Sequence, residues 1–358
     1  MLSSPANLRF GVPGSQMPAR DPAAAARRAE EAGFDSMWWA DRLMGWMPDG
    51  PHALLDPFPL MAVAGVATTR LLLGTAVADP SRRHPAQLAQ TALSVQNLSN
   101  GRLLLGLGCG EVAGTRPYGI RYEKPVAHLE EAITVLHELW RDGRPANFEG
   151  RFYQLNDALC GLAAVTPSPP IWVAAHGPRT IGLTGKVADG WLPTAGGVPA
   201  YAVQLAQLRE AERGAGRSEG AVEAGAFIWL VAAESKERAR QLFRNRGLRA
   251  LGLLLPQGTL AHTPLPDGPW AGLNPTDPHV FDLVDQIDPD ELAEVIPHGS
   301  PEDVAKEVAR YAAAGAQHLV LCDMSATSGE DNGLDLRPLD THVAVREAVR
   351  FGSVDDSA

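Results

Sequence analysis

The chain has 358 residues, of which 45% are hydrophobic, so it can bury a large core, and this argues against a disordered protein. A formal net charge of -11 excludes a basic nucleic-acid-binding surface as the main function, because phosphate binding needs clustered Lys and Arg. No run of about 18 apolar residues and no basic-then-apolar leader occurs, so we expect neither a membrane span nor a secretory signal. The three cysteines are far apart, which predicts reduced thiols in a cytoplasmic protein and no metal site.

The first half of the chain alternates between apolar runs and helical patterns with short connections. Asp21-Pro22 and Asp56-Pro57 each combine an N-cap residue with a proline in the first turn, which predicts two helix starts. Gly33 follows the first of these helices and predicts its end. Strands are expected over 8–12, 36–40, 70–78 and 102–107, and helices over 21–32, 56–67 and 85–98.

The second half continues this alternation. Apolar residues recur at helical spacing through 125–141, and a turn at Glu149-Gly150 predicts a hairpin over 147–155. Further strands are expected over 171–174, 190–192, 224–231 and 318–322, and further helices over 200–213, 235–250, 301–314 and 339–351.

Eight strands that alternate with helices predict an α/β fold of the (β/α)8 TIM-barrel class. We therefore expect a single domain over 1–358. The segment 255–289 is rich in Pro, Gly and Asp and interrupts the alternation, so it is expected to be an insertion or a lid. The polar segment 325–358 is expected to be a C-terminal tail.

A glycine-rich turn follows the fourth predicted strand and ends at an acid, in the order Gly106-Leu107-Gly108-Cys109-Gly110-Glu111. Glycines allow a sharp turn and the close approach of a flat ligand, and a fixed Glu can exchange a proton with it. The run matches neither the dinucleotide-binding spacing nor the P-loop spacing, so it indicates a cofactor only in combination with other motifs.

The active site of such a barrel forms at the C-terminal ends of its strands. Asp41 follows the second strand, Asp79 the third and His176 the fifth, so these residues join Glu111 as candidates. Each also has a structural interpretation. Asp41 could cap a turn or pair with Arg42, Asp79 could start the turn at Pro80, and His176 could be a buried structural histidine.

These strand-end motifs together resemble the luciferase-like oxidoreductase superfamily, and within it the branch that uses the deazaflavin coenzyme F420. The resemblance is carried by the stretches 31–41, 73–77, 83–86, 108–111 and 172–179, and it extends from Arg9 to about Val320. The last stretch, together with 111–119 and 124–127, looks like the phthiodiolone ketoreductase type of enzyme.

The resemblance implies a homodimeric TIM barrel that binds F420, or FMN as the alternative cofactor, at the strand C-termini. It implies a non-proline cis peptide at Ala76–Val77 behind the ring, acids at Asp41 and Glu111 beside the ring, and a helix start near Ala174 that holds the ribityl-phosphate region. The candidate catalytic residues are Glu111, Asp41 and His176. The implied cofactor-binding residues are Asp41, Ala76, Val77, Asp79, Gly108, Cys109, Gly110, Glu111, Ala174, Ala175, His176, Gly177, Pro178 and Arg179.

One position departs from the family pattern. Many relatives have His directly after the acid of the second strand, whereas this chain has Arg42. An arginine does not exchange protons near neutral pH, so the proton must come from another group. Arg42, Met44 and Trp46 are expected to line the substrate position.

The expected reaction is hydride transfer between F420 and a small or apolar carbonyl, alcohol or enoyl substrate. Two alternatives stay open: an FMN-dependent monooxygenase on the same fold, and a non-catalytic flavin- or deazaflavin-binding protein. The expected partners are therefore a small-molecule substrate and a second copy of the chain, and neither nucleic acid nor a membrane.

Overall fold

The computed structural model describes residues 8–14, 21–43, 45–47, 50–52, 54–141, 144–161, 167–256, 258–261, 279–325 and 339–351. Eight parallel strands within these ranges pair in a closed ring, which confirms the predicted (β/α)8 barrel. The strands of the ring are β1 (Arg9–Pro13), β2 (Ser36–Trp39), β5 (Leu72–Thr75), β6 (Leu103–Leu107), β9 (Ile171–Val173), β10 (Gly190–Trp191), β11 (Glu223–Ala232) and β13 (His318–Asp323).

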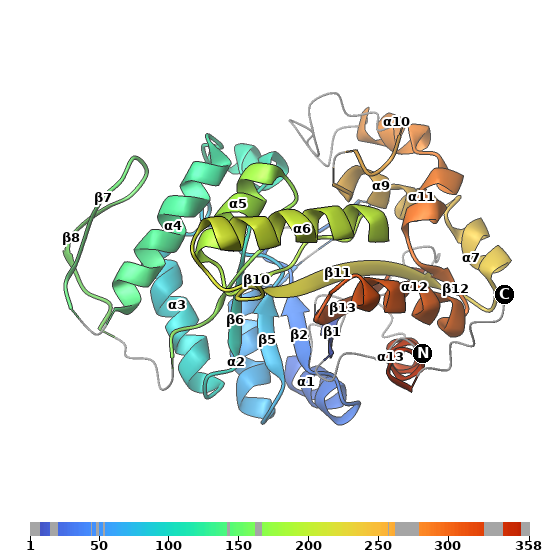
Figure 1. Cartoon of the computed structure of the whole chain (residues 1–358), viewed down its shortest axis with the longest axis horizontal. Coiled ribbons are helices and arrows are strands. Elements are labelled where there is room, and N and C mark those ends of the chain that lie inside the picture. Colours follow the sequence, from blue (N-terminus) through green and yellow to red (C-terminus); the bar gives the residue numbers. More distant parts are fainter. Residues whose placement is uncertain are drawn as a thin grey trace.

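Helices surround the ring and cover its apolar outer face (Figure 1). The Asp21 and Asp56 carboxylates accept hydrogen bonds from the backbone amides of Ala24 and Phe58, as the N-cap pattern predicts. The helices that follow the eight strands in turn include α1 (Pro22–Glu31), α2 (Pro57–Ala67), α3 (Pro85–Leu98), α4 (Pro125–Trp140), α5 (Pro178–Val187), α6 (Val198–Gly214), α12 (Pro301–Ala313) and α13 (Asp340–Phe351).

Large side chains fill the middle of the barrel. The rings of Trp38 and Trp172 meet edge to face with their centroids 5.4 Å apart, and both residues are almost fully buried. Gly74 and Gly190 leave room for these indoles, because a Cβ atom on either glycine would lie 2.1 Å from the neighbouring ring. Leu104, Leu192 and Val320 complete this buried layer. Among the described residues, this layer fills the interior of the barrel below the C-terminal ends of the strands.

The third predicted strand was too long. It ends at Thr75 rather than at residue 78, because Ala76–Val77 is a cis peptide and Ala78 rejoins β6 only through an isolated bridge to Leu107. The cis peptide itself lies where the family resemblance implies it.

The predicted helix over 235–250 was also wrong as one element. It is divided into α7 (Lys236–Leu242), α8 (Arg246–Arg249) and α9 (Leu251–Leu254). The side chain of Asn245 accepts a hydrogen bond from the amide of Gly247 and so starts a new helix, while Phe243 turns into a second apolar cluster.

That second cluster lies beside the barrel and contains elements that the sequence did not reveal. It packs α7 to α9 against α10 (His279–Gln286) and α11 (Pro289–Val295), and β12 (His298–Gly299) pairs with the end of β11. Most of the predicted insertion, residues 257 and 262–278, lies outside the described residues. Thr259 packs against Gly196 after β10, so this flank of the insertion lies at the mouth of the barrel.

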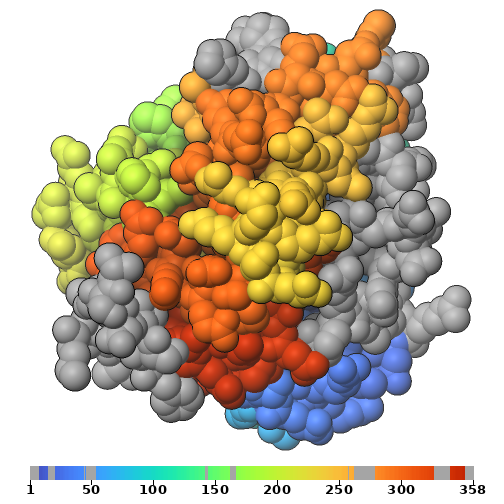
Figure 2. Space-filling view, turned by 90° about the vertical axis from the view of Figure 1, so that its right-hand side faces the viewer, coloured from blue at the N-terminus to red at the C-terminus, as the bar shows by residue number. Residues whose placement is uncertain are grey.

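The C-terminal segment contributes to the fold more than a polar tail would. Val345 and Val349 of α13 belong to the main core, and the guanidinium of Arg346 lies 5.0 Å from the ring centroid of Phe34 after α1. Figure 2 shows the yellow-to-red part of the chain gathered on one side of the molecule, with α1 in blue below α13. Residues 326–338 and 352–358 lie outside the described ranges.

Short elements connect the barrel strands. The hairpin expected over 147–155 is present as β7 (Ala146–Glu149) and β8 (Gln154–Ala158), and it projects from α4 at the left of Figure 1. A second hairpin, β3 (Gly45–Met47) with β4 (Gly50–His52), was not predicted. Two 3-10 helices, η1 (Val112–Gly114) and η2 (Arg116–Tyr118), follow the glycine-rich turn.

Candidate active site at the mouth of the barrel

Small residues occupy the mouth of the barrel above the buried aromatic layer. Ala40, Ala76 and Ala174 follow inward-facing positions of β2, β5 and β9, and all three are only half-buried, whereas Trp38 and Trp172 below them are almost fully buried. A flat ring system that entered from the C-terminal side would thus meet methyl groups at its edges and indoles beneath. This arrangement suits an aromatic cofactor.

Gly106 in β6 and Gly108 just after it make room for the chain at the cis peptide. A Cβ atom on Gly106 would lie 1.9 Å from the carbonyl oxygen of Thr75, and one on Gly108 would lie 2.6 Å from Cγ2 of Val77. The amide of Ala78 donates to Gly106, and the amide of Gly108 donates to Ala78. The first role of Gly106 and Gly108 is therefore steric: their missing side chains leave space for the chain at the end of β5.

Gly110 has a different role, because its φ of +69 lies in the left-handed region that favours glycine. A Cβ atom on Gly110 would lie 2.4 Å from a carboxylate oxygen of Asp79. Asp79 accepts hydrogen bonds from both the amide and the hydroxyl of Ser81, at 2.8 Å and 2.5 Å, which is the turn-forming role considered for it. The turn of β6 thus packs directly on the turn of β5.

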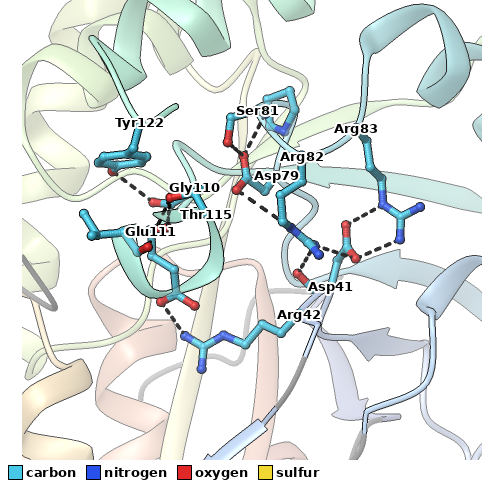
Figure 3. Close-up of polar contacts among 12 residues, drawn as sticks. Asp41, Arg42, Asp79, Ser81, Arg82, Arg83, Gly110, Glu111, Thr115 and Tyr122 are labelled. Carbon is cyan, nitrogen blue, oxygen red and sulfur yellow. Dashed lines mark hydrogen bonds and ion pairs between the residues drawn. The ribbon is translucent and has the colours of Figure 1, made fainter. Parts of the chain in front are cut away.

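Glu111 lies at the start of η1 with its carboxylate facing the segment after β2 (Figure 3). Its Oε2 accepts a hydrogen bond from Nη2 of Arg42 at 2.8 Å, and the two side chains are 28% and 36% exposed. The hydroxyl of Thr115 donates to the Glu111 carbonyl, and that of Tyr122 donates to the Gly110 carbonyl. The backbone of Glu111 is therefore held in place while its carboxylate stays accessible to a ligand.

Asp41 is held very differently, because both of its oxygens are occupied by arginines (Figure 3). Arg82 contacts Oδ1 at 2.7 Å, and Arg83 donates to Oδ2 from Nε at 2.8 Å and to Oδ1 from Nη2 at 2.9 Å. The Asp41 side chain is only 2% exposed. The hydrogen bond to Asp41 raises the pKa of Arg83, so this guanidinium stays charged. Asp41 thus anchors the loop after β5 to the end of β2.

Burial controls the remaining titratable groups of this region. It raises the pKa of the Cys109 thiol to about 12, with Asp79 adding to the effect, so Cys109 is no nucleophile at neutral pH. Burial also raises the pKa of Tyr122 to about 12, which keeps its hydroxyl available as a donor to Gly110. Neither group exchanges protons near pH 7.

His176 lies between the ends of β9 and β10. The amide of Thr194 donates a hydrogen bond to its Nε2 at 2.9 Å, and Gln204 of α6 donates to its carbonyl at 3.1 Å. Burial lowers the pKa of His176 to about 4. Ala175 accepts a hydrogen bond from the Trp191 indole at 2.8 Å. These contacts fix the turn that leads into α5.

The start of α5 brings further implied cofactor residues to the same end of the barrel. Gly177 is the N-cap and has no side-chain cap, Pro178 opens the first turn, and Arg179 is exposed. The first amides of a helix lack partners within it, so such a terminus can receive an anionic group. A phosphate is the kind of group that this terminus and Arg179 would suit.

The sequence of residues 3–318 matches the profile of the family described as Luciferase-like monooxygenase, which covers most of the chain. The chain belongs to the luciferase-like family. This agrees with the resemblance inferred from the strand-end motifs.

Two curated luciferase-like relatives span nearly the whole chain. It is 29% identical over 352 residues to the phthiodiolone/phenolphthiodiolone dimycocerosates ketoreductase of Mycobacterium tuberculosis strain H37Rv, covering 89% of this chain and 92% of the relative. It is 32% identical over 301 residues to the F420-dependent glucose-6-phosphate dehydrogenase of Nakamurella multipartita, covering 82% and 87%.

Solved structures share the luciferase-like fold at lower identity. An F420-dependent secondary alcohol dehydrogenase in complex with an F420-acetone adduct superposes with a TM-score of 0.79 at 23% identity, covering 96% of this chain and 98% of that one. The long-chain alkane monooxygenase LadA superposes with a TM-score of 0.72 at 13% identity, covering 99% and 94%. At these identities the likeness shows the fold alone. No helix among the described residues is long and apolar enough to span a membrane.

Several residues of this luciferase-like site were missed from sequence. Arg82 and Arg83 lie three and four residues after Asp79, and a basic pair close behind a strand-end acid was the available signal. Thr194 was missed because only the ends of β2, β5, β6 and β9 were considered. Among the predicted substrate residues, Arg42 pairs with Glu111, Met44 lies outside the described residues, and Trp46 is described only as a backbone position of β3.

Proposed function

We propose that the chain is a coenzyme F420-dependent oxidoreductase that transfers a hydride between the deazaflavin and a carbonyl, alcohol or enoyl substrate. The relatives named as F420-dependent enzymes support the choice of cofactor. The observation that carries the reaction type is the placement of Glu111, an accessible carboxylate held by Arg42 at the barrel mouth.

The residues present fit the proposed cofactor. The half-buried alanines at the mouth leave room for a planar ring above Trp38 and Trp172. The free amides at the start of α5, with Arg179 beside them, suit the negative charge of a phosphate in a chain whose net charge is -11. When bound, F420 supplies the ring carbon that accepts or delivers the hydride.

Glu111 is the proposed proton partner of the substrate. It takes the hydroxyl proton of an alcohol as the neighbouring carbon loses its hydride, and it returns that proton to the alkoxide in the reverse direction. Arg42 holds Oε2, which leaves Oε1 as the oxygen that exchanges the proton. Asp41, in contrast, is proposed to position Arg82 and Arg83, because both of its oxygens are engaged and it is almost fully buried.

The substitution Glu111→Gln tests this proposal. General acid–base catalysis contributes typically about 10²–10⁴ in rate, so we expect hydride-transfer turnover to fall by at least about a hundredfold. F420 affinity and the thermal midpoint should stay close to those of the wild type, because the side chain keeps its size. Wild-type turnover in the Gln variant would show that Glu111 does not carry the proton.

An FMN-dependent monooxygenase is the second candidate. It is supported by the family profile and by structural neighbours such as the oxygenating constituent of 3,6-diketocamphane monooxygenase in complex with FMN, with a TM-score of 0.67. Anaerobic titration of the apo-protein with oxidised F420 and, separately, with FMN distinguishes the two. Tight binding of FMN without binding of F420 would replace our choice of cofactor.

We further propose that the protein is a cytoplasmic homodimer. Helix α2 has no charged or polar side chain, yet Val63 and Val66 are 41% and 65% exposed, and Leu98 at the end of α3 is 52% exposed. A second copy of the chain is the proposed cover of this face. Sedimentation of the wild type as a dimer and of Val66→Glu as a monomer would support it, and a monomeric wild type would refute it.

A further inference from the structure

The ring of His176, the third of the candidates for proton exchange, is held in a fixed orientation. Its Nε2 receives the backbone amide of Thr194 at 2.9 Å, and its carbonyl receives Gln204. Two elements, the end of β10 and helix α6, thus hold one residue at the mouth of the barrel. The ring cannot turn over without breaking the hydrogen bond from Thr194.

The Thr194 contact also fixes the tautomer of His176. A backbone amide only donates, so Nε2 must present its lone pair, and the ring proton of the neutral form must lie on Nδ1. Among the described residues, none forms a hydrogen bond with Nδ1. Because Nδ1 is not one of the fully buried polar atoms that lack a partner, it keeps some exposure to solvent. The ring therefore carries an Nδ1–H donor that none of the described residues accepts.

His176 stays neutral under working conditions, because burial lowers its pKa to about 4. It therefore cannot supply a proton to an alkoxide near pH 7. Its remaining chemical capacity is to donate one hydrogen bond from a fixed direction.

We propose that His176 donates its Nδ1–H to an oxygen atom of a ligand bound at the barrel mouth, as a neutral donor that never gives up its proton. The inference rests on the proposed function, since F420 and its substrate are the ligands expected there. The acceptor is a neutral carbonyl or hydroxyl oxygen. It belongs either to the cofactor or to the substrate, and the two sources give different results in the test.

Two substitutions separate the two ring nitrogens. His176→Gln places an amide oxygen near the position of Nε2, so it keeps the acceptor for Thr194 and removes the donor at Nδ1. His176→Asn places an amide near the position of Nδ1, so it keeps a donor and removes the acceptor for Thr194. We expect His176→Gln to melt like the wild type and His176→Asn to melt at a lower temperature.

Fluorescence titration with F420 and steady-state kinetics then locate the acceptor. A hydrogen bond between neutral groups is worth about 1 kcal/mol, which is roughly fivefold in affinity. If the acceptor belongs to the cofactor, His176→Gln raises the Kd for F420 about fivefold. If it belongs to the substrate, the Kd for F420 is unchanged and KM rises by that factor. Wild-type values for both constants in His176→Gln would overturn the proposal.

The tautomer can be tested without any ligand. Long-range 1H–15N correlation spectra of the apo-protein at pH 7 should show one histidine, absent in His176→Gln, with its proton on Nδ1. A proton on Nε2 would overturn the proposal whatever the kinetics show. If the wild type binds FMN and not F420, the proposed function fails, and the same comparison of His176→Gln with the wild type is made with FMN.

Discussion

Nη2 of Arg42 lies 2.8 Å from Oε2 of Glu111, joining the segment after β2 to the start of η1 across 69 residues of sequence. The residue after Asp41, where the family resemblance implies a histidine, is thus Arg42 here, and it holds the carboxylate that we propose as the proton partner. Because an arginine keeps its charge, this pair combines one fixed charge with one exchanging group.

Replacing Arg42 should therefore affect the reaction more than the fold. The pair is partly exposed, and such pairs contribute about 1 kcal/mol or less to stability, so Arg42→Gln should leave the free energy of unfolding nearly unchanged. We expect turnover to fall about tenfold, equal to about 1.4 kcal/mol of barrier, because Glu111 loses its orientation. Stopped-flow reduction of F420 measures this. The control is Arg116→Gln, because Arg116 is an exposed arginine in the segment that follows Glu111. This variant should react like the wild type.

Asp41 provides the opposite case, in which stability should suffer most. Asp41→Asn removes the carboxylate 2.7 Å from Arg82, whose side chain is only 6% exposed, and leaves it only the more distant carboxylate of Asp79 at 3.9 Å. Breaking a buried pair from one side costs about 3–5 kcal/mol, so urea unfolding should show a loss of that order. Asp56→Asn is the matched control, because Asp56 also pairs with Arg83 but is 44% exposed, and it should cost about 1 kcal/mol or less. Equal losses in the two variants would contradict the anchoring role of Asp41.

Local patterns predicted the barrel well because each strand and helix start is encoded by neighbouring residues. The caps at Asp21 and Asp56 and the strand before Glu111 are examples. The contacts that define the site are not local. Arg83 reaches Asp41 across 42 residues, and the amide of Thr194 reaches His176 across 18, so neither contact follows from spacing or periodicity. The division of the helix over 235–250 depends likewise on the burial of Phe243 in the second cluster.

The contact between Gly108 and Val77 can be tested by a double-mutant cycle. Gly108→Ala would bring a methyl group to 2.6 Å from Cγ2 of Val77, and overpacking of this kind typically costs about 1–3 kcal/mol. Val77→Ala removes the clashing atom. The loss of unfolding free energy in the double variant should therefore be smaller than the sum of the losses in the two single variants, by about 0.5 kcal/mol or more.

The neighbouring glycine supplies the control for this cycle. Gly106→Ala would clash with the backbone carbonyl of Thr75 at 1.9 Å, so Val77→Ala should not rescue it to the same extent. Chemical unfolding of the five variants gives the coupling energies. If the losses of stability for Gly108→Ala and Val77→Ala were additive, the side chain of Val77 would not be the reason for a glycine at position 108.

Buried histidines should make the fold sensitive to mild acid. Burial lowers the pKa of His176 to about 4, and it also lowers the pKa values of His318 and His342. An unfolded histidine titrates near 6.5, so below that pH the unfolded chain binds protons that the folded chain does not. The free energy of unfolding must then fall as the pH decreases from about 6.5 toward 4.

Urea unfolding between pH 7.5 and pH 5, in roughly half-unit steps, measures this slope, to which one such histidine contributes at most about 1.4 kcal/mol per pH unit. His176→Gln keeps the acceptor for Thr194 but does not titrate, so its stability should decrease less than that of the wild type over the same interval. The difference between the two curves should vanish above about pH 7, where the imidazole is neutral in both the folded and the unfolded chain. Parallel curves down to pH 5 would mean that His176 accepts a proton in the folded protein as readily as in the unfolded one, and the neutral, fixed tautomer would then be wrong.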